Sequence, residues 1–415
     1  MSKRNASRRQ RRRALHASAA GSGPENVIFD PEAPLSQVTY VAYDGTRLVE
    51  EAVADLTAIE ANFGKWPVLW VNVEGLGSPD IIKRLGEIFS IHPLAMEDII
   101  HLHQRAKFEQ YDENFFLVAH MIEGKAGNPS NLVTQEMVAT EQISMYVGSN
   151  FVVTFQEGPV DATKPVLDRL RKGRGLLRSR GSDYLTYAII DSIIDAYYPV
   201  LEAFGERMEV IEDRILEEPS KRLVSQVHIA KRELLGLRRA LFPLREALGS
   251  ILRTSPANFT AETLLHLRDC YDHVIQITDL IETYRELCSD LMDVYLSSIS
   301  NRLNEVMKML TIITTICAPP TLIAGIYGMN FHTDSPYNMP ELSWSYGYFF
   351  ALALMAITST LMLLLLFRSD RFSSKEPTIK WLRNEDAAKA NASETKPSET
   401  NTVAKADDMS GIAGN

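Results

Sequence analysis

Apolar residues are spread unevenly along the chain, and their spacing predicts two kinds of element in its first third. Short apolar or alternating runs predict strands at residues 38–43, 68–73, 115–120, 143–147 and 151–155. Ser78 followed by Pro79 has the pattern of a helix N-cap and first turn, which predicts a helix over 78–89. A second short helix should begin near Pro93. We therefore expect an α/β domain over residues 36–157.

The next part of the chain has helical periodicity. Residues 158–259 should form a helical region in which 184–216 and 221–252 are long amphipathic helices. Pro219 separates these two stretches, which favours an antiparallel pair. Beyond them, residues 260–327 are expected to form a single helix about 100 Å long, at 1.5 Å per residue.

Two stretches near the C-terminus contain no charged residue, residues 309–327 and 347–367. Each is close to the length of about 20 residues that crosses a hydrocarbon layer of about 30 Å. A buried core helix would explain either one alone, but two joined by a short loop favour membrane spans. The loop, 328–346, has no basic residue, whereas Lys308 and Arg368 flank the spans. The positive-inside rule then places both termini in the cytoplasm.

The charge of the chain is as uneven as its hydropathy. The formal net charge is −10, yet residues 1–24 contain seven basic and no acidic residues. Residues 1–35 are expected to form a disordered basic arm, and 368–415 a basic juxtamembrane segment with a disordered tail. The remaining body is strongly acidic, which argues against nucleic acid as a partner and indicates cations.

The motifs of common enzymes and nucleotide-binding proteins are missing. The sequence contains no GxxxxGK[ST], GxGxxG, GxSxG or HExxH motif, so neither an enzyme nor an ATP-driven pump is indicated. The three cysteines, Cys270, Cys288 and Cys317, form no CxxC pair. A disulfide scaffold and a cysteine-based zinc site are therefore not expected.

One face of the predicted long helix is largely small or polar even where the helix becomes apolar. Positions three or four residues apart share a helix face. This face comprises Asp293, Ser297, Ser300, Asn304, Met307, Leu310, Thr314, Ala318, Thr321 and Gly325. The opposite positions are bulky and suit lipid or the second span: Ile312, Ile316, Ile323 and Ile326. Small residues also serve tight helix packing, but the amides of Asn304 and Asn330 at the two ends favour a pore. Such a pore requires several copies around an axis.

The motif Tyr327-Gly328-Met329-Asn330 directly after the first span, with Met339-Pro340-Glu341-Leu342 in the loop, resembles the CorA family of magnesium channels. The resemblance covers about residues 36–370. Three further segments match the family: Ile91 to Leu94 with Glu97 and Asp98, Tyr271 to His273, and Asn304 to Lys308. It implies an α+β membrane protein that assembles as a funnel-shaped homopentamer, with a cytosolic α/β domain and five long stalk helices that continue into the pore.

The resemblance also implies roles for individual residues. Gly328, Met329 and Asn330 would form the selectivity filter, where neutral amide oxygens hold the hydrated ion. Two acids in the loop, Asp334 and Glu341, would raise the cation concentration at the mouth. The pore-lining positions would be Asn304, Met307, Leu310, Thr314, Ala318, Thr321 and Gly325.

The implied function is a passive channel for Mg²⁺ uptake, with Co²⁺ and Ni²⁺ as further candidates, in the inner membrane of a cell and without a nucleotide cofactor. Mg²⁺ would be both substrate and regulatory ligand. Asp98 and Asp293, from neighbouring subunits, would bind intracellular Mg²⁺ and close the channel. Glu97, Asp191 and Asp269 match secondary acidic positions.

Two alternatives stay open, a zinc transporter of the same superfamily and a membrane-tethered helical scaffold without a pore. The sequence also departs from the family pattern. Eight residues, 331–338, separate the two loop motifs where three are common, and Ala318 stands where a methionine is familiar. Pro320 follows Pro319 where one proline is usual.

Overall fold

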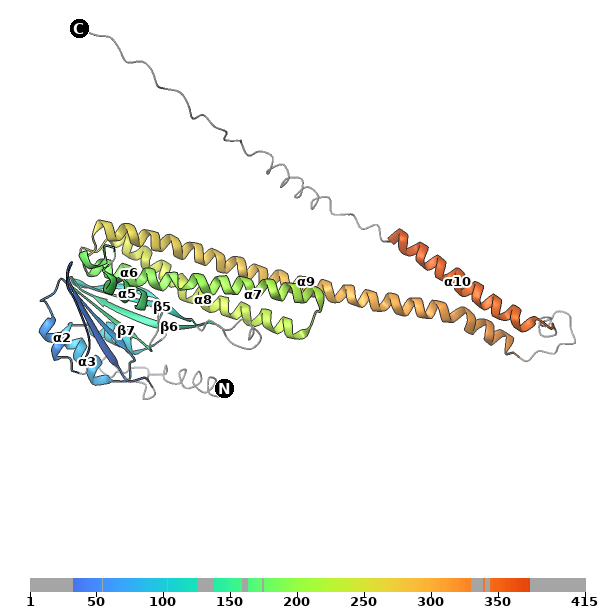
Figure 1. Cartoon of the computed structure of the whole chain (residues 1–415), viewed down its shortest axis with the longest axis horizontal. Coiled ribbons are helices and arrows are strands. Elements are labelled where there is room, and N and C mark those ends of the chain that lie inside the picture. Colours follow the sequence, from blue (N-terminus) through green and yellow to red (C-terminus); the bar gives the residue numbers. More distant parts are fainter. Residues whose placement is uncertain are drawn as a thin grey trace, which may run out of the picture. The chain divides into compact units, whose positions relative to one another are not determined.

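Figure 1 shows the computed structural model of the chain, which describes residues 33–53, 55–102, 104–124, 138–158, 163–173, 175–329, 339 and 344–373. The chain divides into two compact units, residues 1–300 and 301–415. Most of the predicted basic arm and of the predicted C-terminal tail lies outside the described residues.

The first unit contains a seven-stranded sheet with the strand order β2-β1-β3-β7-β6-β5-β4. Strands β3 and β7 run parallel, and every other neighbouring pair is antiparallel. The strands are β1 (Gln37–Tyr43), β2 (Leu48–Val53), β3 (Val68–Glu74), β4 (Lys107–Tyr111), β5 (Asn114–Gly124), β6 (Val138–Val147) and β7 (Phe151–Gln156). The five predicted strands are confirmed as β1, β3, β5, β6 and β7.

Each face of the sheet carries its own hydrophobic core, because alternate side chains of a strand point to opposite faces. Val41 and Trp70 belong to the core that the long helices cover, whereas Tyr40 and Leu69 belong to the core that short helices cover. All six residues of β7 are buried, as expected for a strand covered on both faces.

Short helices cover the second face of the sheet. They are α2 (Thr57–Asn62), α3 (Pro79–Ile88) and α4 (Pro93–Ile100). The predicted helix after Ser78 is confirmed, but the Ser78 side chain makes no capping hydrogen bond to α3. Its hydroxyl oxygen instead accepts the backbone N–H of Ser36, at 3.1 Å, and so ties the entry of β1 to the start of α3.

The other face packs against a helical layer. After α5 (Lys164–Lys172) and the 3-10 turn η3 (Leu177–Ser179) come α6 (Ser182–Asp195), α7 (Tyr197–Glu217), α8 (Lys221–Thr254) and α9 (Ala261–Tyr327). The prediction of a single helix over 184–216 is wrong, since α6 ends at Asp195 and α7 begins at Tyr197. Between α7 and α8, Arg207 and Glu233 form an ion pair whose side chains are 6% and 5% exposed.

A buried carboxylate organises the start of α9. Asp183 in α6 accepts hydrogen bonds from the Thr260 N–H at 3.0 Å, the Thr260 hydroxyl at 2.9 Å and the Thr263 hydroxyl at 2.7 Å. Thr260 in turn accepts the Thr263 N–H, at 3.2 Å. The N-terminal N–H groups of a helix have no partner within the helix, so α6 supplies the acceptor and fixes where α9 begins.

The second unit consists of the C-terminal part of α9 and the helix α10 (Gly347–Ser373). Helix α9 is continuous from Ala261 to Tyr327, as predicted, and it passes through Pro319 and Pro320 without ending. Helix α10 begins where the second span was predicted and extends past it by six residues.

Replacement of Asp183 by Ala should lower the free energy of unfolding by about 2 kcal/mol. Loss of an N-cap interaction costs about 1 kcal/mol, and the Thr260 and Thr263 hydroxyls also lose their acceptor. Thermal unfolding of the full-length protein in detergent measures the effect. The control is Asp213→Ala, because Asp213 is exposed on α7. Equal unfolding midpoints for the two variants would show that Asp183 does not stabilise α9.

Candidate functional site

The second unit contains two helices that are long and apolar enough to cross a membrane. They are the apolar part of α9 and residues Gly347–Leu366 of α10. None of the residues in their most apolar windows is buried. A core helix of a water-soluble protein would hide such a surface, so the exposed apolar side chains fit a lipid environment.

Exposure divides the apolar part of α9 into two faces. Ile312, Ile316 and Ile323 are partly covered, whereas Ile326, which was predicted to lie with them, is 46% exposed. The predicted pore-lining positions are all exposed: Asn304, Met307, Leu310, Thr314, Ala318, Thr321 and Gly325. Helix α10 contacts the covered face at Ile316. The small and polar stripe is therefore part of the surface that this chain leaves open, together with bulky positions such as Ile313 and Leu322, which are 51% and 66% exposed.

The threonine hydroxyls of the stripe are already satisfied as donors. Thr314 donates to the Leu310 carbonyl at 3.0 Å, and Thr321 donates to the Cys317 carbonyl at 2.7 Å. A hydroxyl that donates to its own helix still has lone pairs that can accept. Both positions thus present acceptor oxygens on the exposed face, which suits the hydrogens of an ion's water shell.

Gly328 sits at the end of α9, where its N–H donates to the Ala324 carbonyl at 2.9 Å. A Cβ at this position would lie 3.2 Å from the same carbonyl oxygen. Gly328 has no positive φ, so any residue could adopt its backbone conformation. What glycine provides here is the absence of a Cβ close to the Ala324 carbonyl oxygen. Met329 follows and is 50% exposed. Asn330, Asp334 and Glu341 lie outside the described residues.

The two predicted regulatory acids lie on different helices and in different surroundings. Asp98 in α4 is 15% exposed, and the Lys107 ammonium lies 2.7 Å from its carboxylate. Lys107 also contacts Glu109, at 2.8 Å. Asp293 is exposed on α9. A cation bound at the Asp98 carboxylate would compete with the Lys107 ammonium.

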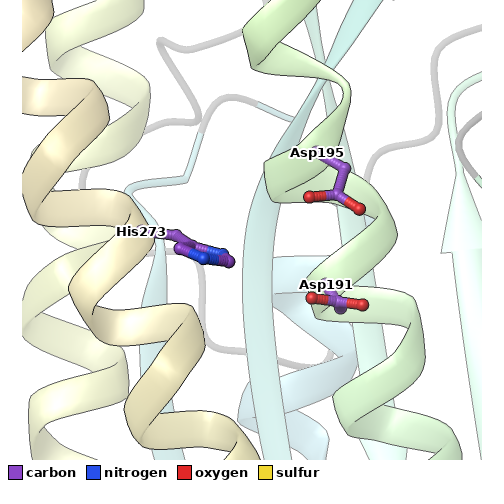
Figure 2. Close-up of side chains that lie close together, drawn as sticks. All are labelled: Asp191, Asp195 and His273. Carbon is purple, nitrogen blue, oxygen red and sulfur yellow. The ribbon is translucent and has the colours of Figure 1, made fainter. Parts of the chain in front are cut away.

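A different group of ligand-type side chains does meet within one chain. One ligand atom from each of Asp191, Asp195 and His273 lies within 4.8 Å of the other two. Figure 2 shows the two carboxylates on successive turns of α6, facing the imidazole on α9. Asp269, one turn before His273, lies 3.9 Å from its ring, but the Asp269 side chain is 70% exposed. We call Asp191, Asp195 and His273 the α6–α9 cluster.

The sequence analysis assigned Asp191 and Asp269 to secondary acidic positions but missed Asp195. The usable signal is a pair of i, i+4 spacings, Asp191 with Asp195 and Asp269 with His273. Each spacing places two ligand-type side chains on one helix face. The contact between the two helix faces is a feature of the tertiary structure, and no local sequence pattern predicts it.

The α6–α9 cluster is partly shielded from water, and this changes its electrostatics. Burial raises the pKa of Asp191, and the negative charge of Asp195 raises it further. The Cys270 thiol lies 3.7 Å from the Asp191 carboxylate, and burial raises its pKa strongly. Cys270 is therefore a protonated neighbour rather than a thiolate ligand. Two carboxylates and an imidazole together suit a divalent cation, and the nitrogen ligand suits transition metals better than Mg²⁺.

Comparisons with known proteins agree with the fold and with the two apolar C-terminal helices. The family model "CorA-like Mg2+ transporter protein" matches residues 67–368. The cobalt/magnesium transport protein CorA of Thermotoga maritima is 44% identical over 293 residues, which cover 71% of this chain and 80% of that protein. The putative metal ion transporter YfjQ of Bacillus subtilis is 35% identical, over 70% of this chain and 86% of its own.

The fold is shared with a solved structure of the same family. The complete structure of the CorA magnesium transporter from Methanocaldococcus jannaschii superimposes with a TM-score of 0.65 at 22% identity. The similarity covers 81% of this chain and 98% of that chain. It extends over the α/β domain, the long helix and both apolar C-terminal helices.

Replacement of Asp191 by Asn should stabilise the metal-free protein at neutral pH. The raised pKa means that folded Asp191 keeps its proton above the ordinary value of 3.8, where the unfolded chain has lost it. Stability conferred by this group therefore falls as the pH rises through that window. In EDTA at pH 7 the variant should unfold at a higher temperature than the wild type, and the difference should shrink towards pH 4.

Divalent cations should reverse that order. Co²⁺ should raise the unfolding temperature of the wild type more than that of Asp191→Asn, because a bound ion stabilises the folded state. Asp213→Asn is the control, since that carboxylate is exposed on α7. A Co²⁺-induced rise of equal size in the wild type and in Asp191→Asn would contradict ion binding by Asp191.

Proposed function

This chain belongs to the family of CorA-like Mg²⁺ transporter proteins, and from that membership we propose that it forms a passive Mg²⁺ channel driven by the membrane potential. The family consists of transporters rather than enzymes. The Thermotoga relative is named for cobalt as well as magnesium, which supports Co²⁺ as a second cargo; Ni²⁺ is a further candidate on chemical grounds.

The observation that carries the proposal is the open stripe of α9. It combines small and polar positions with exposure along its whole length, in a helix whose opposite positions Ile312, Ile316 and Ile323 are partly covered. In a lipid environment, small and polar side chains favour protein or water over hydrocarbon. A single copy leaves them uncovered, so the stripe requires further copies of the chain around a common axis. The family resemblance gives the number of copies as five.

We infer the path of the ion from this arrangement. Asn330 would form an outer ring of amide oxygens that binds hydrated Mg²⁺ through its waters, because Mg²⁺ gives up water reluctantly. Acceptor oxygens of Thr321 and Thr314 would follow. Met307 and Leu310, 59% and 54% exposed in one chain, would meet their copies in a hydrophobic constriction that closes by dewetting.

Closure would depend on intracellular Mg²⁺ bound by acidic residues. Carboxylates of Asp98 and Asp293 from adjacent copies repel each other unless a cation lies between them. Mg²⁺ binding would therefore hold the copies in the closed arrangement, and depletion would release them. Glu97 is the neighbour of Asp98 in α4, and Asp191 and Asp269 belong to the region of the α6–α9 cluster. Lys107 would act as a competitor for Asp98.

The charges that flank the two spans indicate how the chain is oriented in the membrane. The basic flanks and the acidic loop favour a cell inner membrane with both termini in the cytoplasm. On this view the first unit, with its α/β sheet and helical layer, is cytoplasmic. Membrane lipid, divalent cations and further copies of the chain are its partners, and no nucleotide is required.

Asn330→Ala should abolish potential-driven Mg²⁺ entry while the oligomer still assembles. The variant removes the amide that we expect to bind the hydrated ion, so flux should fall at least about tenfold. Purified protein in liposomes with an internal Mg²⁺-sensitive dye and an inside-negative potential measures entry. Gln276→Ala is the control for the loss of an amide, because Gln276 is exposed on α9 but lies before the first residue of the stripe, Asp293.

The same experiment separates the alternatives. Wild-type vesicles that admit Zn²⁺ but not Mg²⁺ would assign the chain to zinc transport. Intact oligomers that admit neither ion, nor Co²⁺, would leave a membrane-tethered scaffold. Flux through Asn330→Ala at the wild-type rate would remove Asn330 from the selectivity filter.

Asp98→Asn combined with Asp293→Asn should make the channel resist closure. The Mg²⁺ concentration on the cytoplasmic face that halves the flux should rise about tenfold, within the usual range of allosteric coupling. The flux assay is repeated with low and millimolar Mg²⁺ on that face. Asp213→Asn serves as control for the loss of exposed charge, and an unchanged half-closing concentration would exclude the two aspartates as the sensor.

A further inference from the structure

The pair Pro319-Pro320 removes two hydrogen-bond donors from the middle of the first span. In an α-helix the carbonyl of residue i accepts the N–H of residue i+4, and in a tighter 3-10 turn it accepts the N–H of residue i+3. Proline has no backbone N–H. The Ile316 carbonyl therefore loses both its α partner, Pro320, and its 3-10 partner, Pro319.

The neighbouring carbonyl, that of Thr315, keeps one possible N–H donor, and the comparison shows the effect of the second proline. The Thr315 carbonyl loses Pro319 as its α partner but can still accept the N–H of Ala318. With Pro319 alone, the Ile316 carbonyl would keep the N–H of residue 320. Pro320 thus creates an orphan acceptor at Ile316, at a depth where hydrocarbon offers no water to satisfy it.

A side chain from the second span supplies the missing donor. The Ser359 hydroxyl in α10 donates to the Ile316 carbonyl at 3.2 Å. Ser359 and Ile316 are both partly buried. This hydrogen bond joins α10 to α9. It lies on the covered face of α9, opposite the open stripe.

The adjacent hydroxyls of α10 behave differently. Thr358 donates to the Leu354 carbonyl at 2.9 Å, and Thr360 donates to the Ala356 carbonyl at 2.7 Å. Such bonds within a helix are the usual way for a hydroxyl to be satisfied in a membrane span. Ser359 instead bonds across to α9, at the carbonyl that has lost its own donors.

We propose that Ser359 is a positioning residue of the permeation path, which replaces the N–H that Pro320 lacks and thereby fixes the rotation of α9 at the proline pair. The proposal rests on the channel function proposed above. A helix held at Ile316 presents the opposite face, with Ala318 and Thr321, in one orientation. Without the bond, the segment is free to turn or tilt to satisfy the carbonyl elsewhere, and the stripe turns with it.

The test is a double-mutant cycle in the full-length protein: wild type, Ser359→Ala, Pro320→Ala and the double variant. Residue 320 as alanine has an N–H, which satisfies the Ile316 carbonyl within α9. Ser359→Ala should therefore lower the thermal stability of the oligomer and shift the half-closing Mg²⁺ concentration when Pro320 is present. It should change neither when Pro320 is replaced.

The expected size follows from hydrogen bonds between membrane helices. Such bonds correspond to about a three- to fifteenfold change in an equilibrium constant, and the half-closing concentration should move by a factor in this range. Ser359→Thr should restore wild-type behaviour, since it keeps the hydroxyl. Thr358→Ala is the matched control, because its hydroxyl bonds within α10.

Two results would overturn the proposal. One is a Ser359→Ala variant that matches the wild type in both measurements, and the other is an effect of equal size with and without Pro320. Failure of the channel itself would look different. If the vesicles admit no cation, but Ser359→Ala still lowers thermal stability only when Pro320 is present, the channel is refuted and the bond from Ser359 to the Ile316 carbonyl is supported. Active vesicles with no coupling would refute the pairing and leave the channel.

Discussion

Inside hydrocarbon, every polar group must find its partner within the protein, and this requirement explains most features of the second unit. Thr314 and Thr321 bond back to their own helix, and Ser359 serves a carbonyl that two prolines have deprived of donors. The same requirement implies that the open stripe of α9 needs a polar or protein environment. Small and polar positions exposed on a membrane helix need either another protein surface or water, and a ring of copies provides both.

The two proposed ion-binding regions would use different chemistry, in keeping with different tasks. An ion in transit must bind weakly, so neutral oxygens suit the stripe and the amide of Asn330. An ion that regulates must stay bound, so carboxylates suit the first unit. There Asp191 and Asp195 face His273, and burial makes ionised Asp191 costly when no cation is present. The sheet and the Asp183 contact at the start of α9 hold these helices in place.

Much of the fold could be predicted from the sequence, wherever a segment has a strong local pattern. The charge-free spans, the continuous α9 and five strands follow from hydropathy alone. Strands β2 and β4 were missed because they are edge strands, whose polar side chains give no apolar run. The break between α6 and α7 does have a sequence signal, which the prediction overlooked: Pro199 has no backbone N–H, so the Asp195 carbonyl has no α-helical partner there. Asp195 and Ser359 acquire their roles through tertiary contacts, Asp195 with a second helix and Ser359 with the Ile316 carbonyl, which no sequence spacing encodes.

If the stripe of α9 faces water, thiols placed on it will be accessible to water-soluble reagents. In a Cys317→Ser background, single cysteines replace Thr314 and Thr321 on the stripe, or Ile312 and Ile323 on the covered face. Reconstituted protein at low Mg²⁺ is then treated with a small, charged, thiol-specific reagent. We predict that the stripe cysteines react and that their modification blocks Mg²⁺ entry, while the covered ones stay unmodified. Equal reaction on both faces, or faster reaction at residues 312 and 323, would contradict the account.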